Sequence, residues 1–586
     1  MIKKTKIVCT IGPASESKEI LKSLMLNGMN VARLNFSHGT HEEHQVRIDT
    51  IKEVREMLGL PVAIMLDTKG PEIRLGQFGV ESVELKIGDI FTLTPKDIQG
   101  NQSIVSITYK ELYKDVHVGG TILIDDGLVE LTIREITEDG DLICRVENNG
   151  ILKSKKGVNV PNMRISLPAV TEKDKSDLRF GVRNGIDYVA ASFVRKAQDV
   201  IDIRRVLEES GGVNVRIIAK IENCEGVENV EEILQVADGI MVARGDLGVE
   251  IPAEEIPLIQ KKIVSSCNQL GKPVIIATQM LDSMQRNPRP TRAEVTDVAN
   301  AILDGTDAIM LSGETAAGKY PINAVETMYK IALNIESSDS FKEVVLDRVH
   351  WREANTSNAI SQSTCTLADE LGASAIVSPT TSGITAMAIS KYRPAVPIVA
   401  TTYTEEVRRK LALIWGVESV LCEQTEATDE VLEKSINAAF NAELISEGDL
   451  IIITAGIPAG IAGTTNMIKV HTVGNVLVRG LGIGKKSVSA KTCVGSSKEE
   501  LEGRFEEGMI LVSKTTEVDM IEYIKKASAL VVEEGGLTSH AAIVGLSLEL
   551  PTIIGAADAT LKIKDNETIT VDAASGLVYS GCVKAL

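Results

Sequence analysis

The amino-acid sequence predicts an α/β protein: a (β/α)8 TIM barrel with an inserted small all-β barrel domain, a C-terminal α/β domain and an additional C-terminal domain. Three observations support this prediction. Apolar runs of strand length alternate with segments of helical periodicity, which is typical of parallel β/α units. That periodicity disappears between residues 70 and 168, where short alternating runs replace it. The 586 residues also exceed what one hydrophobic core normally contains.

The predicted barrel occupies residues 1–69 and 169–339. Its strands should be continuous apolar runs, because parallel strands are buried on both faces. In chain order these runs are KTKIVCTIG, MNVARLNF, PVAIMLDT, DYVAASF, RIIAKIE, GIMVARG, PVIIAT and AIMLSG. Helix-patterned segments follow most of them, including 17–27, 42–58, 200–209 and 256–270, and residues 320–336 are expected to form the closing helix.

The inserted domain is predicted at residues 70–168, between the third strand and its helix. Its strand signals alternate in polarity and are separated by Gly, Asp and Asn turns: SVELKIGDIFTLTP, GTILIDDGLVELTIREI and DLICRVENNG. A β domain hinged over the catalytic end of a barrel would act as a lid.

Two further domains are predicted after the barrel. Residues 340–473 combine the strand signals SAIVSPT, VPIVATT and DLIIITAG with helices at 357–371 and 405–413. Residues 474–586 begin with GLGIGKKSVSAKT, which we interpret as a linker because it is rich in Gly, Lys and Ser. The strand signals GMILVSK, SALVVEE, TIIG and TITVDA follow.

Composition excludes several classes of function. A formal net charge of −19 argues against a nucleic-acid partner or an anionic membrane, which would both require a basic face. No apolar run approaches the roughly 20 residues needed to cross a bilayer. The N-terminus shows no cleavage site, so we expect a cytoplasmic protein. The 8 cysteines never occur as CxxC, which favours free thiols over zinc or disulfides.

Polar side chains follow most of the predicted barrel strands. The carboxyl ends of barrel strands are where catalytic groups gather, so these side chains should meet at one rim. Any single one could be an ordinary polar group at a strand end, but their number favours a site. In chain order they are Arg33, Asn35, Ser37, Asp67, Thr68, Lys220, Glu222, Arg244, Asp246, Thr278, Ser312 and Glu314.

Lys220, Glu222 and Asp246 are the most informative members of this set. Two carboxylates at neighbouring strand ends can hold a divalent metal ion, and the lysine beside them can hold an anion. This combination suits phosphoryl transfer, in which charge must be held in place and little covalent chemistry is required.

Several long strings resemble those of the pyruvate kinase family: VARLNFSHG, LDTKGPEIR, SKKGVNVP, AKIENCEGV, MVARGDLGVE, ATQMLDSM and MLSGETAAGKYP. The resemblance covers residues 1 to about 473 as barrel, lid and allosteric regulatory domain. It implies a glycolytic kinase that moves the phosphoryl group of phosphoenolpyruvate to ADP, giving pyruvate and ATP. It also implies a homotetramer.

The resemblance implies a role for each strand-end residue. Glu222 and Asp246 would hold Mg²⁺, Lys220 would stabilise the transferring phosphoryl group, and Arg33 would clamp the phosphate. The amides of Gly245 and Asp246, at a helix N-terminus, would receive the substrate carboxylate. Thr278 would lie near the enolate and assist a proton relay through water, because a threonine is itself a poor general acid.

A monovalent-cation site and a nucleotide site are also implied. Asn35, Ser37, Asp67 and Thr68 would hold K⁺, and Glu72 matches family members that require this ion. The nucleotide-side residues would be His38, Arg74 and Lys156, the last reaching the phosphates only when the lid closes.

The run SHGTHEEH places His38, His41 and His44 at a spacing that could suggest a metal site. HEEH is one residue short of the HExxH arrangement, and no buried acidic partner follows it in the sequence. We therefore expect His41 and His44 to lie in a solvated first helical turn.

A possible effector loop comprises Thr380, Thr381, Ser382, Gly383 and Thr385, between a strand and a helix. Hydroxyls and amides there could form a phosphate nest or simply cap the helix. The resemblance favours an allosteric phosphate site. The facing loop, TAGIPAGIAGTTN, lacks the Trp and Arg of the animal enzymes, so AMP or a sugar monophosphate is expected rather than fructose 1,6-bisphosphate.

The last segment contains GGLTSHAAIVGLSLELPTIIGAADAT, which resembles the phosphohistidine domain of phosphoenolpyruvate-utilising enzymes. His540 occupies the phosphocarrier position, so it could be a swinging phosphohistidine. We favour a retained fold that serves packing, assembly or stability, because no separate nucleotide-grasp domain is recognised. The alternatives to the kinase are a dikinase or synthase working through His540 and a non-catalytic effector-binding scaffold.

Overall fold

The computed structural model describes residues 2–346, 355–425, 427–456 and 465–583. The chain divides into two compact units. The first contains residues 1–352 together with 390–393 and 404–419, and the second contains the remainder. The first unit therefore holds the barrel and the inserted domain.

Eight parallel strands form a closed barrel in the order β1-β16-β15-β14-β13-β12-β3-β2. The predicted fold class is therefore confirmed, and every apolar run assigned to the barrel supplies a strand. The strands are β1 (Lys6–Thr10), β2 (Val31–Asn35), β3 (Ala63–Asp67), β12 (Tyr188–Ala191), β13 (Arg216–Ile221), β14 (Gly239–Ala243), β15 (Val274–Ala277) and β16 (Ala308–Leu311).

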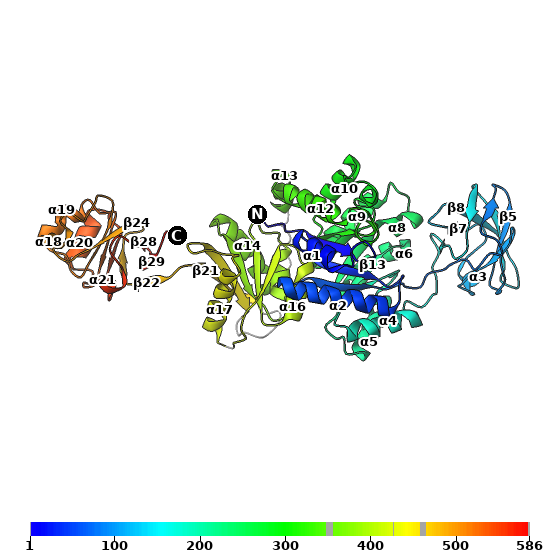
Figure 1. Cartoon of the computed structure of the whole chain (residues 1–586), viewed down its shortest axis with the longest axis horizontal. Coiled ribbons are helices and arrows are strands. Elements are labelled where there is room, and N and C mark those ends of the chain that lie inside the picture. The colour runs from blue at the N-terminus through cyan, green and yellow to red at the C-terminus, as the bar shows by residue number, and fades with distance from the viewer. Residues whose placement is uncertain (1, 347–354, 426, 457–464, 584–586) are drawn as a thin grey trace. The chain divides into compact units, whose positions relative to one another are not determined.

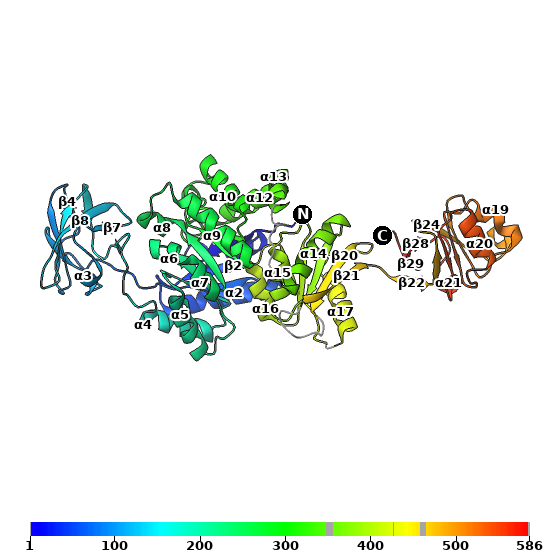
Figure 2. The same ribbon diagram turned by 180° about the vertical axis from the view of Figure 1, so that it is seen from behind.

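Helices surround these strands (Figures 1 and 2). Three of them begin with a capping box at Thr40, Thr171 or Thr291, which satisfies free amides of the first turn. The barrel helices are α1 (Lys18–Leu26), α2 (His41–Leu58), α4 (Glu172–Arg183), α5 (Ala197–Glu209), α6 (Cys224–Glu228), α7 (Val230–Val236), α8 (Arg244–Glu250), α9 (Ile256–Leu270), α10 (Arg292–Asp304), α11 (Gly313–Ala316), α12 (Pro321–Glu336) and α13 (Asp339–Leu346).

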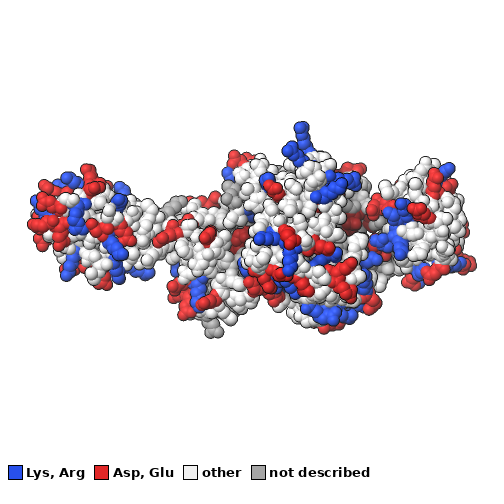
Figure 3. Space-filling model, viewed as in Figure 1, with Lys and Arg blue, Asp and Glu red and all other residues white. Residues whose placement is uncertain are grey.

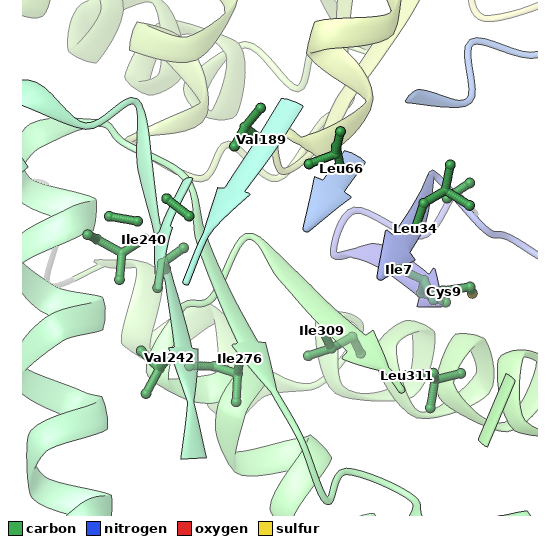
Figure 4. Packing of buried hydrophobic residues seen from close by; sticks show 14 of the residues in the cluster. Ile7, Cys9, Leu34, Leu66, Val189, Ile240, Val242, Ile276, Ile309 and Leu311 are labelled. Atoms are coloured by element: carbon green, nitrogen blue, oxygen red, sulfur yellow. The ribbon is translucent and has the colours of Figure 1, made fainter. Parts of the chain in front are cut away.

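Alternate strand residues form two separate cores. Ile7 and Cys9 belong to the large cluster shared with the surrounding helices, whereas Val8 between them belongs to the smaller cluster. Figure 4 shows members of the large cluster on neighbouring strands. The small cluster contains inward-facing residues of all eight strands together with Ala412 and Leu413. The barrel is therefore a packed core rather than a pore.

Buried ion pairs lie at the amino ends of the strands. Asp187 accepts the backbone N–H of Ile64 at 2.9 Å and pairs with Arg409, also at 2.9 Å. Asp307 pairs with Arg393 at 2.8 Å and accepts the backbone N–H of Val274 at 3.0 Å. This end of the barrel therefore depends on residues from the 390–393 and 404–419 segments.

The inserted domain has its own hydrophobic core, separate from that of the barrel. A six-stranded sheet, β11-β7-β8-β9-β5-β6, and a two-stranded sheet, β10-β4, build it together with one short helix. The elements are β4 (Val83–Leu85), β5 (Ile90–Thr94), β6 (Ile104–Ser106), α3 (Leu112–Asp115), β7 (Thr121–Ile124), β8 (Val129–Ile136), β9 (Leu142–Val146), β10 (Gly150–Leu152) and β11 (Val158–Asn159).

A five-stranded sheet, β19-β18-β17-β20-β21, forms the α/β domain that follows. Its strand order changes direction between β17 and β20, the position where doubly wound sheets bind ligands. The elements are α14 (Thr356–Glu370), β17 (Ala375–Pro379), α15 (Ile384–Ser390), β18 (Ile398–Thr402), α16 (Glu405–Lys410), η3 (Leu411–Leu413), β19 (Val417–Leu421), α17 (Thr428–Asn441), β20 (Leu450–Gly456) and β21 (Thr465–Thr472).

The additional domain is an eight-stranded sheet in the order β22-β29-β28-β24-β25-β26-β27-β23. Its elements are β22 (Val476–Arg479), β23 (Leu481–Ile483), β24 (Ser487–Val494), α18 (Lys498–Leu501), β25 (Ile510–Ser513), η4 (Val518–Met520), α19 (Ile521–Ile524), β26 (Ala529–Val532), α20 (His540–Ser547), β27 (Thr552–Ile554), α21 (Ala559–Lys562), β28 (Thr568–Asp572) and β29 (Leu577–Ser580).

The linker predicted at GLGIGKKSVSAKT is wrong, because these residues form β23 and most of β24. Val488 and Ala490 alternate with polar residues and pack against the domain core. Gly482 is required for close packing, since a Cβ atom there would lie 1.9 Å from the carbonyl oxygen of Ala573. Its glycines therefore allow contact between strands and do not mark a flexible linker.

No helix among the described residues is both long enough and apolar enough to span a membrane. On the face drawn in Figure 3, acidic and basic side chains are interspersed.

Candidate active site

Lys220, at the carboxyl end of β13, is the centre of a buried polar network. Its Nζ donates to Ser192 Oγ at 2.8 Å and contacts Glu222 Oε1 at 2.9 Å and Asp67 Oδ1 at 3.2 Å. Asp67 also accepts Arg33 Nε at 2.5 Å through its other oxygen. The ends of β2, β3, β12 and β13 therefore meet in one cluster, as the strand-end pattern predicts.

Asp67 is stabilised in its charged form by Arg33 and Lys220, and in turn it stabilises the charged form of Lys220. Burial opposes ionisation of Asp67, but Arg33 and Lys220 outweigh it and lower the pKa of the carboxyl group. Burial likewise opposes the charge on Lys220, yet Asp67 and Glu222 raise the pKa of its amine above the usual value. Lys220 is therefore a permanent cation despite being buried.

Glu222 and Asp246 carry negative charge that the protein does not fully compensate. Burial raises the pKa of Glu222, and the nearby charge of Asp246 adds to this effect. The pKa of Asp246 is also raised, first by burial and then by the charges of Asp67 and Asp126. A bound cation would relieve this repulsion, so the two carboxylates fit a divalent metal ion.

The described residues contain no group of three or more His, Cys, Asp or Glu side chains that could hold a metal ion. An ion between Glu222 and Asp246 would therefore need oxygen ligands from substrate and water. Mg²⁺ commonly binds proteins in this way, through one or two carboxylates plus substrate phosphates.

Thr278 follows β15 in a strained conformation. Its φ is 66° and that of Gln279 is 55°, a region that non-glycine residues rarely adopt. Arg244 Nη2 donates to the Thr278 carbonyl at 3.0 Å, and the Gly245 amide donates to Thr278 Oγ1 at 2.7 Å. The first turn of α8 and Thr278 are thus held together, and the Gly245 amide is engaged by the hydroxyl here.

The residues predicted to hold a monovalent cation lie at the ends of β2 and β3. Asn35 Oδ1 accepts the Ser37 amide at 3.0 Å, and the Thr68 carbonyl accepts Ser192 Oγ at 2.7 Å. Together with Asp67 they form an all-oxygen donor set with one carboxylate, which fits a hard monovalent cation.

The predicted nucleotide-side cations are paired with acidic groups. Arg74 contacts Glu72 at 2.7 Å, and Lys156 contacts Asp125 at 2.7 Å. His38 is exposed in the loop after β2. These three residues do not join the Lys220 network through any contact between described residues.

A cavity of about 280 Å³ adjoins the strand ends. It is lined by residues of the barrel and of the inserted domain, among them Glu72, Asp126, Asn159, Asn223, Asp246 and Glu250. The cavity thus includes Asp246 and reaches the segment that carries Lys156.

The prediction that His41 and His44 lie in a solvated turn is wrong. His44 is buried, its ring stacks on Phe36 with centroids 3.9 Å apart, and its Nε2 lies 2.9 Å from the His38 carbonyl. His41 Nε2 lies 2.7 Å from Oδ1 of the buried Asp177. The acidic partner was not recognised because it lies on α4, far away in sequence.

The predicted effector loop lies between β17 and α15. Thr380 Oγ1 accepts the Gly383 amide at 2.9 Å, and Thr385 Oγ1 lies 2.9 Å from Thr465 Oγ1. Ser382 and Thr381 lie between them in the same loop. Residues 457–464 of the facing loop, on which the choice of effector depends, lie outside the described residues.

His540 is the first residue of α20, and Ser539 caps this helix by accepting the Ala542 amide. His540 Nδ1 lies 3.0 Å from Thr516 Oγ1, which leaves Nε2 as the nitrogen not engaged in that contact.

Sequence reasoning missed Ser192, which connects Lys220 to the Thr68 carbonyl. Its position near the end of the run DYVAASF was an available signal, because Arg33, Asp67 and Lys220 also lie at or near the carboxyl ends of their strands. Thr10 was missed in the same way and accepts Arg33 Nη1 at 2.8 Å.

A closed β/α barrel with buried cations and carboxylates at its carboxyl rim defines a barrel enzyme that acts on an anionic substrate. Comparison with known proteins narrows this class. Residues 2–325 match the pyruvate kinase barrel domain, 358–471 match the pyruvate kinase alpha/beta domain, and 505–576 match the mobile domain of PEP-utilising enzymes.

Relatives named pyruvate kinase match over the full length of both chains. Those from Geobacillus stearothermophilus and Bacillus licheniformis are each 53% identical, and one from Staphylococcus aureus is 50% identical, all with 100% of each chain covered. The chain belongs to the pyruvate kinase family and is an enzyme, a glycolytic phosphotransferase. The resemblance found in the sequence is thereby confirmed.

Proposed function

We propose that the chain transfers the phosphoryl group of phosphoenolpyruvate to ADP at the carboxyl rim of the barrel, giving pyruvate and ATP in the cytoplasm. The observation that carries this proposal is the position of Lys220, buried among Asp67, Glu222 and Ser192. A permanent cation held rigidly at a strand end can stabilise charge that develops on a transferring phosphoryl group.

Arg33 and Lys220 act as the phosphate clamp. Both cations are oriented by the carboxylate of Asp67, so neither must reorganise when the phosphoryl oxygens arrive. Arg33 is also fixed by Thr10 at 2.8 Å. Its planar guanidinium can still contact phosphate through nitrogens that are not used within the protein.

Glu222 and Asp246 would hold Mg²⁺. The bound ion would offset negative charge on the phosphoryl and enolate oxygens. Their raised pKa values support this assignment, because desolvation and the neighbouring carboxylates oppose the charged forms of both groups despite Lys220, and a bound cation would offset that effect. Glu222 is kept in place by the Phe193 amide, which donates to its Oε2 at 2.6 Å.

Asn35, Ser37, Asp67 and Thr68 would hold K⁺, which would add positive charge beside the phosphate clamp. The all-oxygen donor set supports this role. Glu72, which pairs with Arg74 in this structure, also supports the role, because family members with a glutamate at this position require K⁺.

Thr278 positions the end of the substrate that receives a proton. Gly245 and Asp246 lie in the first turn of α8, where a substrate carboxylate would replace the Thr278 hydroxyl as the acceptor of the Gly245 amide. The released hydroxyl would then orient a water that delivers the proton to the enolate carbon.

His38, Arg74 and Lys156 would contact the nucleotide. Arg74 and Lys156 are neutralised by Glu72 and Asp125 in this structure, so ADP phosphates would compete with those carboxylates. Lys156 would approach with closure of the inserted domain.

The enzyme is proposed to work as a homotetramer under control of a phosphorylated effector, AMP or a sugar monophosphate. Support for the effector site comes from the loop of Thr380, Thr381, Ser382, Gly383 and Thr385, at the carboxyl end of β17 beside the point where the strand order changes. The hydroxyls and amides of this loop suit a single phosphate.

A second activity is phosphate transfer through His540. The contact with Thr516 favours it, because it fixes the ring and leaves Nε2 available as a nucleophile. We retain a structural role for this domain as the preferred assignment. Incubation with ³²P-labelled phosphoenolpyruvate and detection of acid-labile label at His540 would reverse that preference.

An enzyme-coupled assay of ATP formation from phosphoenolpyruvate and ADP tests the main proposal. Glu222→Gln and Asp246→Asn should each lower kcat by two orders of magnitude or more. Glu250→Gln is the matched control, because Glu250 is a half-buried carboxylate on α8 that lines the same cavity as Asp246 but is not a proposed ligand. Equal losses in all three variants would contradict the assignment of the metal ligands.

A further inference from the structure

Two side-chain clusters hold the loop Asn35–His38, which begins at the last residue of β2. It carries two proposed K⁺ ligands, Asn35 and Ser37, and one proposed nucleotide residue, His38. The inference below therefore rests on the proposed function. None of the supporting residues belongs to the site itself.

The first cluster is formed by His44 of α2. Its ring stacks on the ring of the buried Phe36 at 3.9 Å with an interplanar angle of 11°. Its Nε2 lies 2.9 Å from the His38 carbonyl oxygen, which can only accept, so Nε2 carries the proton. His44 Nδ1 is buried and has no hydrogen-bond partner among the described residues. The His44 imidazole is therefore a neutral ring that donates its hydrogen bond to the His38 carbonyl.

The second cluster is formed by Lys173 and Asp177 of α4 with His41 of α2. Lys173 Nζ donates to the Phe36 carbonyl at 2.8 Å and to Asp177 Oδ2 at 2.6 Å. Asp177 Oδ1 lies 2.7 Å from His41 Nε2. His41 in turn stacks on Phe180 of α4 with centroids 4.4 Å apart. Two helices are therefore tied to the same loop.

These contacts engage alternate carbonyls of the loop. The Phe36 and His38 carbonyls are bound by Lys173 and His44, while Asn35 Oδ1 accepts the Ser37 amide at 3.0 Å. Hydrogen bonds to two carbonyls restrict the loop backbone that carries the side chains of Asn35 and Ser37. A preorganised ligand set binds its ion more tightly than one that must be ordered on binding.

We propose that His44 and the Lys173–Asp177–His41 cluster are positioning residues that preorganise the Asn35–His38 loop for K⁺. They act on the cation site through the backbone and do not contact substrate. Loss of either clamp should weaken K⁺ binding and should be overcome by raising the K⁺ concentration.

The test compares wild type with His44→Leu, His44→Gln and Lys173→Met. Leu fills the volume without a donor, whereas Gln retains an N–H that can reach the carbonyl. Lys175→Met is the matched control, because Lys175 lies on the same helix but pairs with Glu172 at 2.6 Å and not with the loop. Each protein is titrated with K⁺ while Tm and phosphoryl transfer are both followed, with ionic strength held by tetramethylammonium chloride.

The dissociation constant of K⁺, fitted to the rise of Tm with K⁺ concentration, should increase about tenfold in His44→Leu and Lys173→Met, the factor expected when one hydrogen bond to the loop is lost. It should rise less in His44→Gln and stay within twofold of wild type in Lys175→Met. Saturating K⁺ should restore most of the activity lost at low K⁺.

A wild type whose Tm and activity do not respond to K⁺ would overturn the proposed cation site and this inference with it. If the wild type responds to K⁺ but the dissociation constant of K⁺ is unchanged in His44→Leu and Lys173→Met, the positioning role alone would be overturned. Lys173 is half exposed, so the result for this variant stands even if substitution of the buried His44 prevents folding.

Discussion

Replacing Lys220 with methionine should abolish most catalysis and also destabilise the barrel. Methionine preserves the unbranched shape and most of the length of the side chain but removes its charge and its three contacts, with Ser192, Glu222 and Asp67. The variant therefore tests whether the network at the strand ends acts as the phosphate clamp.

The size of both effects can be worked from the contacts. At about 3 Å and an effective dielectric constant of about 20, each ion pair of Lys220 is worth roughly 5 kcal/mol before desolvation. Removing the cation leaves the buried Glu222 without its ion-pair partner and Asp67 with Arg33 alone. Loss of one partner of a buried ion pair typically lowers the free energy of unfolding by about 3–5 kcal/mol. Loss of one preorganised charge-stabilising group lowers kcat by roughly 10²–10³.

The assay combines coupled measurement of ATP formation with denaturant unfolding of the same preparation. Lys410→Met is the control, because Lys410 is also buried and ion-paired, with Glu406 at 2.5 Å, but lies on α16. It should lose stability with kcat within about twofold of wild type, a change of less than about 0.5 kcal/mol in the barrier. A folded Lys220→Met variant with kcat within tenfold of wild type would refute the reasoning.

Three further outcomes are expected. His540→Ala should turn over at close to the wild-type rate in the coupled assay, because the barrel site is complete without it; loss of activity would favour the alternative route through this histidine. Arg409→Met should lower the free energy of unfolding, measured by urea titration, by about 3–5 kcal/mol, because it removes the 2.9 Å partner of the buried Asp187. Arg205 forms an exposed ion pair at 3.8 Å, so Arg205→Met should change that free energy by less than about 1 kcal/mol. AMP or ribose 5-phosphate should lower the phosphoenolpyruvate concentration at half-maximal rate, and activation by fructose 1,6-bisphosphate alone would contradict the preferred class of effector.

The barrel strands could be predicted because local pattern and tertiary environment agree there. A parallel strand buried on both faces must be apolar along its whole length, so runs such as PVAIMLDT leave little choice. The topology of a parallel barrel alone places the polar residues at the ends of these runs on one rim. Lys220, Glu222 and Asp67 meet there as predicted.

The strand signals of β23 and β24 were misread because glycine and lysine dominate the segment. Glycine is frequent in linkers, but here it allows close packing of strands, as Gly482 against Ala573 shows. Only the alternation of Val488 and Ala490 indicated a strand, and that signal is short.

The residues that hold the Asn35–His38 loop could not be predicted from the sequence. His44 and the His38 carbonyl that it contacts are six residues apart in the sequence. Lys173 and Asp177 belong to a helix more than a hundred residues later, after the inserted domain. Their contact depends on how α2 and α4 pack against the barrel, which no local pattern specifies. Thr278 likewise combines a positive φ with hydrogen bonds to Arg244 and Gly245, which lie on a different element, so its own sequence neighbours do not indicate this conformation.

The central claim is that Glu222 and Asp246 share one divalent cation beside Lys220. Binding of Mn²⁺ as a substitute for Mg²⁺, followed by electron paramagnetic resonance in the presence of phosphoenolpyruvate, tests it most directly. One site per chain is expected in wild type and in Glu250→Gln, with at least tenfold weaker binding in Glu222→Gln and in Asp246→Asn. Unchanged Mn²⁺ affinity in the latter two variants would show that the metal lies elsewhere.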